Sequence, residues 1–212
     1  FMYSYPEFTT YYRRTFRDVK NCLGKFSALF GSYPFAKEHY SQTVFGWNGG
    51  MEHQTNSFIG TGWDQLVAHE LGHQWFGNKV TCGSWADLWL NEGFASYMQY
   101  IYVQHFDTAS RRLHLQNLLS NITSEPGGSV YVTDTTTTAR LFSGRLTYNK
   151  GAYVVHMLRW ILGDRVFSDG LKRYLNDPAI AYGFARTDDL ERNLEAESGK
   201  DLDEFFQNWI YG

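Results

Sequence analysis

The chain has 212 residues and a formal net charge of −3 at pH 7, and 43% of its residues are hydrophobic and 19% charged. A chain of this length is the size of one domain and can bury one substantial core. The slightly acidic balance argues against a nucleic-acid-binding protein, because such proteins gather a basic excess on one face, and no run of about 18 apolar residues predicts a membrane span.

The first part of the chain predicts a helix followed by a small β element. Residues 6–30 carry apolar side chains at helical spacing, namely Phe8, Tyr12, Phe16, Val19, Leu23 and Phe26. Residues 40–62 then change to short, glycine-punctuated runs rich in β-prone residues. These runs predict strands at 43–45 and 57–59 on either side of a turn at 48–50.

The rest of the chain has a mainly helical pattern. Helices are expected at 64–76, 84–105, 108–121, 146–162, 168–175 and 187–197, and a last short one begins at 201. A connection rich in glycine, serine and threonine occupies 124–138. A small sheet followed by helices predicts an α+β domain that is predominantly helical.

The first motif with a chemical meaning is His69-Glu70-Leu71-Gly72-His73, an HExxH sequence. Residues four apart on a helix lie one above the other, so both imidazoles can reach one metal ion. The flanking residues are apolar, so buried imidazoles here would need a partner such as a metal. Two histidines are nevertheless only two ligands, and a surface helix with two incidental histidines remains an alternative at this point.

A third ligand is available on the next predicted helix. Eighteen residues (74–91) separate His73 from Glu92, enough for a turn and an antiparallel return. A carboxylate facing two imidazoles gives a set of two histidines and one glutamate with the fourth position open to water. That arrangement is typical of a hydrolytic zinc site, and we expect one zinc ion per chain, held by His69, His73 and Glu92, with Glu70 as general base.

Four sequence blocks together resemble the M1 aminopeptidases, zinc enzymes of the thermolysin-like gluzincin group. The blocks occur in the family's order at residues 49–52 (GGME), 69–78 (HELGHQWFGN), 89–95 (WLNEGFA) and 148–151 (YNKG). The resemblance implies a thermolysin-like zincin catalytic domain over residues 1–212. It also implies that the N-terminal β domain and the C-terminal helical domain of the family lie outside this sequence.

The resemblance gives roles to residues that spacing alone does not mark. It implies that an exposed edge strand pairs with the substrate backbone through Gly49, Gly50 and Met51, and that Glu52 grips the free α-ammonium group. It also implies that Tyr148 donates a hydrogen bond to the developing oxyanion. The family continues its first block with asparagine where this chain has His53, which affects how Glu52 is held.

The function implied is that of a zinc-dependent aminopeptidase acting on peptides with a free N-terminus. Two alternatives stay open: a peptide-binding module without chemistry, which would lack the base or the tyrosine, and an endopeptidase, which would not need Glu52. The stretch at residues 80–85 resembles exported bacterial members of the family and favours a secreted or periplasmic protein. Oligomeric state and the preferred N-terminal side chain are not predicted.

Overall fold

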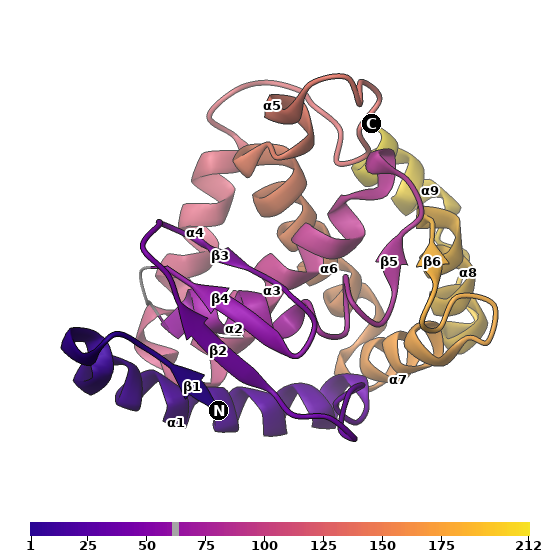
Figure 1. Cartoon of the computed structure of the whole chain (residues 1–212). Helices are drawn as coiled ribbons and strands as arrows, with labels where there is room; N and C mark the ends of the chain where they lie inside the picture. The colour runs from indigo at the N-terminus through magenta and orange to yellow at the C-terminus, as the bar shows by residue number, and fades with distance from the viewer. Residues whose placement is uncertain (61–63) are drawn as a thin grey trace.

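The computed structural model describes the backbone of residues 1–60 and 64–212, and all side chains of these residues except those of 9–17 and 64. Helices dominate and a small sheet is built from the N-terminal part, so the predicted α+β class is confirmed (Figure 1). Two expected positions of the first helix, Tyr12 and Phe16, lie outside the described side chains, and Gly62, the expected end of the β element, lies outside the described residues.

The long helix α1 (Thr9–Phe30) confirms the first predicted helix and runs beneath the sheet (Figure 1). A short 3-10 helix, η1 (Pro6–Phe8), precedes it. The helix ends where Gly31 adopts a φ of 93°, in the left-handed region that glycine tolerates. The Gly31 amide donates to the carbonyl of Ser27 over 3.1 Å and closes the last turn.

The sheet has four strands in the order β1-β2-β4-β3. Its strands are β1 (Met2–Tyr3), β2 (Ser41–Val44), β3 (Gly50–Met51) and β4 (Asn56–Ile59). The two strands expected at 43–45 and 57–59 are β2 and β4, which pair in parallel instead of forming a simple hairpin. The segment between them adds β3, antiparallel to β4, so that β3 lies at the edge of the sheet.

Two helices behind the sheet position the predicted motifs. Helix α2 (Asp64–Gly72) ends four residues before its predicted end, because the chain turns at 73–76. A 3-10 helix, η2 (Trp85–Asp87), leads into α3 (Trp89–Phe106). The two helices approach closely, since a Cβ on Gly72 would overlap the side chain of Met98.

The remaining elements surround α3. They are β5 (Thr81–Cys82), η3 (Thr108–Ser110), α4 (Arg111–Ile122), α5 (Thr138–Leu141), η4 (Gly144–Lys150), α6 (Gly151–Leu162), α7 (Asp164–Asn176), β6 (Phe184–Ala185), α8 (Thr187–Ser198), α9 (Asp203–Phe206) and η5 (Gln207–Tyr211). The parallel pair of β5 and β6 is not predicted from the sequence. Nor is η4, a π-helix where an α-helix is expected from residue 146.

The main core gathers around α3, which is buried along most of its length. Aromatic rings pack the space between α3 and the neighbouring segments, and Phe76 and Phe94 stack with centroids 4.3 Å apart and planes at 4°. Within residues 1–60 and 64–212, no helix has both the length and the apolar character needed to cross a lipid bilayer. The rigid packing fixes α3 as the support of the site described next.

Candidate active site

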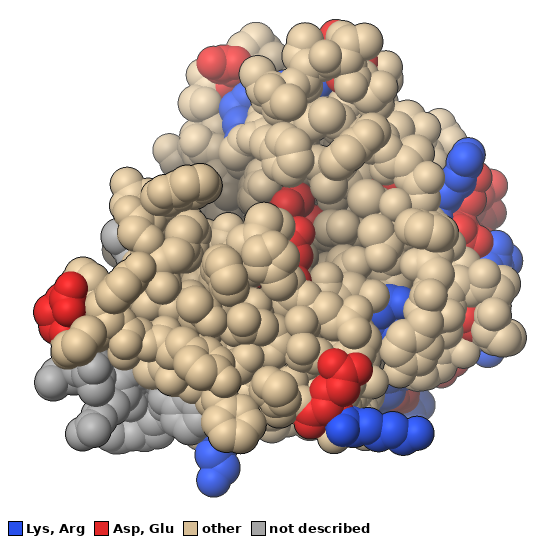
Figure 2. Space-filling view, viewed as in Figure 1, with Lys and Arg blue, Asp and Glu red and all other residues tan. Residues whose placement is uncertain are grey.

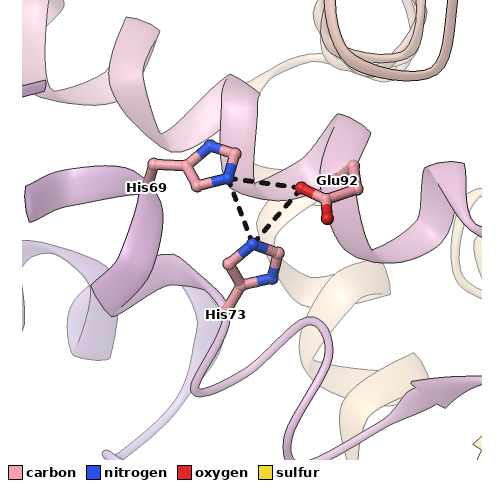
Figure 3. Close-up of side chains that lie close together, drawn as sticks. All are labelled: His69, His73 and Glu92. Carbon is pink, nitrogen blue, oxygen red and sulfur yellow. Dashed lines mark hydrogen bonds and ion pairs between the residues drawn. The ribbon is translucent and has the colours of Figure 1, made fainter. Parts of the chain in front are cut away.

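Three side chains meet where α2 ends and α3 begins: His69, His73 and Glu92 (Figure 3). The Nε2 atoms of His69 and His73 are 3.1 Å apart. They lie 3.3 and 3.4 Å, respectively, from Glu92 Oε2. Ligand atoms at about 2.0–2.1 Å from a tetrahedral zinc ion are separated by about 3.3 Å from one another. The triangle therefore has the size that such an ion requires, and the expected ligand set fits it.

The orientation of His73 is fixed by the backbone that follows α2. Its Nδ1–H donates to the carbonyl of Phe76 over 3.0 Å, which directs Nε2 at His69 and Glu92 and leaves this nitrogen available to a metal once it has lost its proton. Gly77 has a φ of 136°, and a Cβ there would lie 3.1 Å from His73 Nδ1. A glycine at this position therefore lets the turn pack against the imidazole.

The charges of His73 and Glu92 also favour the binding of a cation between them. Burial raises the pKa of Glu92, but the charge of His73 and hydrogen bonds from both imidazoles outweigh it and hold the pKa well below its usual range. Burial lowers the pKa of His73, whereas Glu92, Glu52 and Glu70 raise it to about 10. Without a metal, protons would have to balance these carboxylates, and a divalent cation can replace them.

Glu70 lies on α2 between the two histidines, is almost completely buried, and has one carboxylate oxygen without a hydrogen-bond partner. Burial raises its pKa to about 7, the charges of His69 and His73 oppose this, and Glu52 and Glu92 add to it. The carboxylate packs against Gly50 of β3, where a Cβ would overlap it. A carboxylate with such a pKa is suited to accept and return a proton near neutral pH.

Glu52 follows β3 directly and lies beside the same group of side chains. Its carboxylate and the ligand atoms of Glu70 and His73 lie within 4.8 Å of one another. The side-chain amide of Asn78 donates to the Glu52 backbone carbonyl over 2.8 Å. Sequence reasoning assigns Asn78 no role, although its position in the HExxH block is a signal that could have drawn attention to it.

His53, which stands where the family has asparagine, does not disrupt this arrangement. Its ring contacts Phe58 with centroids 4.8 Å apart. Its backbone carbonyl accepts a hydrogen bond of 3.4 Å from the side chain of Gln74. Asn78 and Gln74, both from the segment after α2, therefore hold the two successive peptide groups on either side of the His53 Cα.

Tyr148 approaches the triangle from η4. Its ring stacks on His69 with centroids 6.1 Å apart and planes at 13°. Burial and the neighbouring carboxylates of Glu92, Glu52 and Glu70 raise the pKa of its phenol. The phenol thus stays protonated and can donate a hydrogen bond into the site.

One cavity of about 1060 Å³ joins these groups. Figure 2 shows acidic side chains at the floor of a hollow in the middle of this face. All nine predicted site residues line the cavity, namely Gly49, Gly50, Met51, Glu52, His69, Glu70, His73, Glu92 and Tyr148. Their individual roles remain predictions, but the structure brings them together in one place.

Comparisons with known proteins match this chain to a peptidase family and to aminopeptidases. The family profile described as Peptidase family M1 domain matches residues 53–209. The chain is 38% identical over 154 residues to aminopeptidase N of Lactococcus lactis subsp. lactis, which covers 68% of this chain and 18% of the relative. It is 37% identical over 155 residues to aminopeptidase M1 of Arabidopsis thaliana, covering 68% of this chain and 17% of that protein.

The fold of this chain is also similar to that of a solved structure. The M1 zinc metallopeptidase from Deinococcus radiodurans superposes with a TM-score of 0.80 at 24% identity, over 92% of this chain and 43% of that one. This similarity shows a shared fold. The chain spans less than a fifth of the two aminopeptidases, at 18% and 17% of their lengths.

Proposed function

Because this chain belongs to peptidase family M1, we propose that it carries the catalytic site of an aminopeptidase, which hydrolyses the first peptide bond of peptides with a free N-terminus. The observation that supports this most strongly is the position of Glu52. Its carboxylate lies within 4.8 Å of the ligand atoms of Glu70 and His73. It lines the same cavity as His69 and Glu92. An anchor for a positive group this close to the reacting centre suits a substrate whose chain begins there.

His69, His73 and Glu92 would hold one zinc ion with a fourth position left open. When bound, zinc polarises the scissile carbonyl and brings the pKa of its bound water toward about 7. The carbonyl of Phe76 accepts from Nδ1–H of His73 and so leaves Nε2 for the metal, and Gly77 leaves room for the turn beside the imidazole. The site has no fourth protein ligand among the described residues, which favours a hydrolytic over a structural metal site.

Glu70 would take the proton from the attacking water and pass it to the leaving amine. Its buried carboxylate, with a pKa raised to about 7 by burial, can hold the proton between the two steps. Tyr148 would donate a hydrogen bond to the oxygen of the scissile carbonyl as negative charge develops there. Its ring lies against His69, on the side of the cavity formed by η4.

Substrate binding would use the edge of the sheet. Among residues 1–60 and 64–212, β3 pairs only with β4, so its other edge would be available to an extended peptide. Glu52, directly after β3, would then bind the α-ammonium group at the end of that peptide. A peptide bound in this way would have its first peptide bond beside Glu70 and the metal ligands His69, His73 and Glu92.

The test is the hydrolysis of alanine p-nitroanilide compared with its N-acetylated form by the zinc-loaded chain. We expect cleavage of the free amine only, because acetylation removes the charge that Glu52 binds. Glu52→Gln should raise KM and reduce the difference between the two substrates, while Glu70→Gln should keep its zinc and lose turnover. Equal cleavage of the acetylated amide would favour an endopeptidase, and undiminished turnover by Glu70→Gln would remove Glu70 as the base.

A further inference from the structure

The turn that follows Glu52 contains a strained residue. Residues 53–56 form a turn that is closed by a hydrogen bond of 3.1 Å from the amide of Asn56 to the carbonyl of His53. Its third residue, Thr55, has a φ of 63°, in the left-handed region. A positive φ at this position of a turn is usually found with glycine or asparagine, and a β-branched residue such as threonine is disfavoured there. The surroundings therefore have to hold Thr55 in a conformation that it would not prefer by itself.

The side chain of Gln74 holds this turn from one side. Its Oε1 accepts a hydrogen bond of 3.0 Å from the amide of Thr55, and its Nε2 donates to the carbonyl of His53 over 3.4 Å. Because Gln74 is completely buried, water cannot readily replace these hydrogen bonds. Strand β2 holds the other side, since the amide and the hydroxyl of Ser41 donate to the Thr55 carbonyl over 2.8 and 3.1 Å. Thr55 is thus fixed at both its amide and its carbonyl.

The turn lies directly beside Glu52, so its shape affects where this carboxylate lies. Strand β3, which precedes Glu52, is only two residues long. The Glu52 carbonyl accepts from Asn78, and the turn begins at the next residue. A relaxation at Thr55 would change the direction of the chain next to Glu52. Its carboxylate would then shift from its present position within 4.8 Å of the ligand atom of His73.

We propose that Gln74 is a positioning residue, which holds the strained turn at residues 53–56 and thereby keeps Glu52 beside the metal ligands. Gln74 follows the predicted ligand His73 directly in the chain. The same piece of backbone would therefore carry a metal ligand and fix the residue proposed to bind the α-ammonium group. The inference rests on the proposed function, because only that function gives Glu52 a group of the substrate to bind.

The test replaces Gln74 by methionine, which has a similar length but cannot donate a hydrogen bond and accepts one only weakly. In the zinc-loaded chain, Gln74→Met should raise KM for alanine p-nitroanilide about 10-fold, the effect of one hydrogen bond. The change in kcat should be smaller, because the ammonium group is bound in the ground state and the transition state alike. Zinc content should stay at about one ion per chain.

Gln104→Met is the matched control. It makes the same change at a partly buried glutamine of α3, whose Oε1 accepts from Arg159 over 2.9 Å. Gln104 follows Glu92 by twelve residues, which is about 18 Å along a helix. This variant should therefore leave KM unchanged.

Glycine at position 55 separates the hold on the turn from a general effect of packing. Glycine adopts a positive φ without strain, so the turn should keep its shape there with less help from Gln74. We expect Gln74→Met to raise KM by less than about threefold in a Thr55→Gly background, against about 10-fold with threonine. A residue that acted through packing alone would have the same effect in both backgrounds.

Hydrogen exchange of the Thr55 amide measures the turn without turnover. This amide donates to Gln74, so its exchange should become faster on the order of 10-fold in Gln74→Met and stay unchanged in Gln104→Met. Thermal unfolding of each variant shows whether it folds. If Gln74→Met does not fold, the addition of Thr55→Gly should restore folding, because it removes the strain.

The results separate this inference from the proposed function. If the unmodified chain does not cleave alanine p-nitroanilide, the proposed function fails and with it the role of Glu52, whereas faster exchange in Gln74→Met would still support the hold on the turn. If the chain is active but Gln74→Met changes neither KM nor the exchange of the Thr55 amide, the inference is wrong. It is also wrong if KM rises equally with threonine and with glycine at position 55, or if Thr55→Gly does not rescue an unfolded Gln74→Met protein.

Discussion

Gly50 is the point at which the sheet and the proposed general base meet. A Cβ at this position would overlap the carboxylate of Glu70, whereas a Cβ on Gly46, in the segment before β3, would meet no atom within 4 Å. Gly50→Ala should therefore push the end of the Glu70 side chain out of place without disturbing the fold. We expect kcat to fall by about 10- to 100-fold, with zinc content and Tm unchanged.

The matched control for this prediction is Gly46→Ala, which makes the same change where there is room for it. Metal analysis and thermal unfolding of both variants should give values close to those of the unmodified chain. A Gly50→Ala protein with full kcat would mean that the position of Glu70 tolerates the added methyl group. In that case the contact between Gly50 and Glu70 does not contribute to the rate of catalysis.

The pKa of Glu70 should shape the pH dependence of activity. Burial raises this pKa to about 7, and the negative charge of Glu52 contributes to the increase. The base acts as a carboxylate, so kcat/KM should fall as pH decreases through the pKa of Glu70, and bound zinc should place this fall below pH 7. Glu52→Gln removes one negative neighbour and should shift the fall to lower pH.

This prediction is checked by pH profiles of kcat/KM for an uncharged substrate with the unmodified chain and with Glu52→Gln. The absolute rates will differ because Glu52 also binds the substrate, so only the position of the acid limb is compared. A limb that moves to higher pH in Glu52→Gln would contradict the assignment of this limb to Glu70.

Residue patterns predict the metal ligands but not every member of the site. His69, His73 and Glu92 follow from helical spacing and from the chemistry of their side chains. Glu52 and Tyr148 have no local signal, and only the family resemblance marks them. Asn78 is given no role by either, because its hydrogen bond to the Glu52 carbonyl depends on how the segment after α2 lies against the chain after β3.

At the scale of elements, the π-helix η4 directs Tyr148 at the site. The carbonyl of Ser143 accepts bonds from the amides of both Thr147 and Tyr148, and its hydroxyl accepts from Leu146 N. A π-helix inserts a residue relative to an α-helix and so turns the following side chains. The hydrophobic pattern of this segment predicts a helix correctly, but it has no feature that distinguishes the two types of helix.

Helices α3 and α6 touch through glycines. A Cβ on Gly151 would lie 3.0 Å from the Cα of Gly93, and a Cβ on Gly93 would lie 3.1 Å from the backbone of Gly151. Because backbone atoms cannot move aside as side chains do, Gly151→Ala should separate the helices slightly. We expect a destabilisation of about 1–3 kcal/mol and weaker zinc binding, since Glu92 precedes Gly93 on α3.

Denaturant unfolding and a competitive zinc titration measure these two effects. Gly24→Ala on α1 is the control, because a Cβ there meets no atom within 4 Å. It should stabilise the helix by about 0.5–1 kcal/mol without changing zinc affinity. Unchanged stability and zinc affinity in Gly151→Ala would show that the two helices can separate at no cost.

At the scale of the whole molecule, a buried link joins two segments that lie far apart in the sequence. The Thr187 hydroxyl, at the start of α8, donates to Asp87 over 2.8 Å and accepts from the indole of Trp89 over 3.0 Å. These buried contacts join α8 to the start of α3 across about half of the chain. The sequence predicts the helices that take part but neither this link nor the parallel pairing of β2 and β4, because both depend on which distant segments meet.

Zinc should stabilise the whole chain, since its proposed ligands come from two separate segments that only the fold brings together. At a free zinc concentration of about 1,000 times Kd, binding adds about 4 kcal/mol, and Tm should rise on the order of 10 °C for a protein of this size. Chelation should reverse the increase. Glu92→Gln, which weakens the ligand set, should lose most of it.

The increase in Tm should also depend on pH in a defined direction. Although burial lowers the pKa of His73, Glu92 and its neighbours raise it to about 10 in the absence of metal, so zinc has to displace a proton from this side chain. Zinc affinity should therefore increase with pH, and the Tm increase should be larger at pH 8 than at pH 6. Thermal unfolding with and without zinc at both values measures this, with Gln116→Lys, at an exposed position of α4 outside the cavity, as a variant expected to behave as the unmodified chain does. An equal or larger increase at pH 6, or a full increase in Glu92→Gln, would mean that the ion binds elsewhere than at His69, His73 and Glu92.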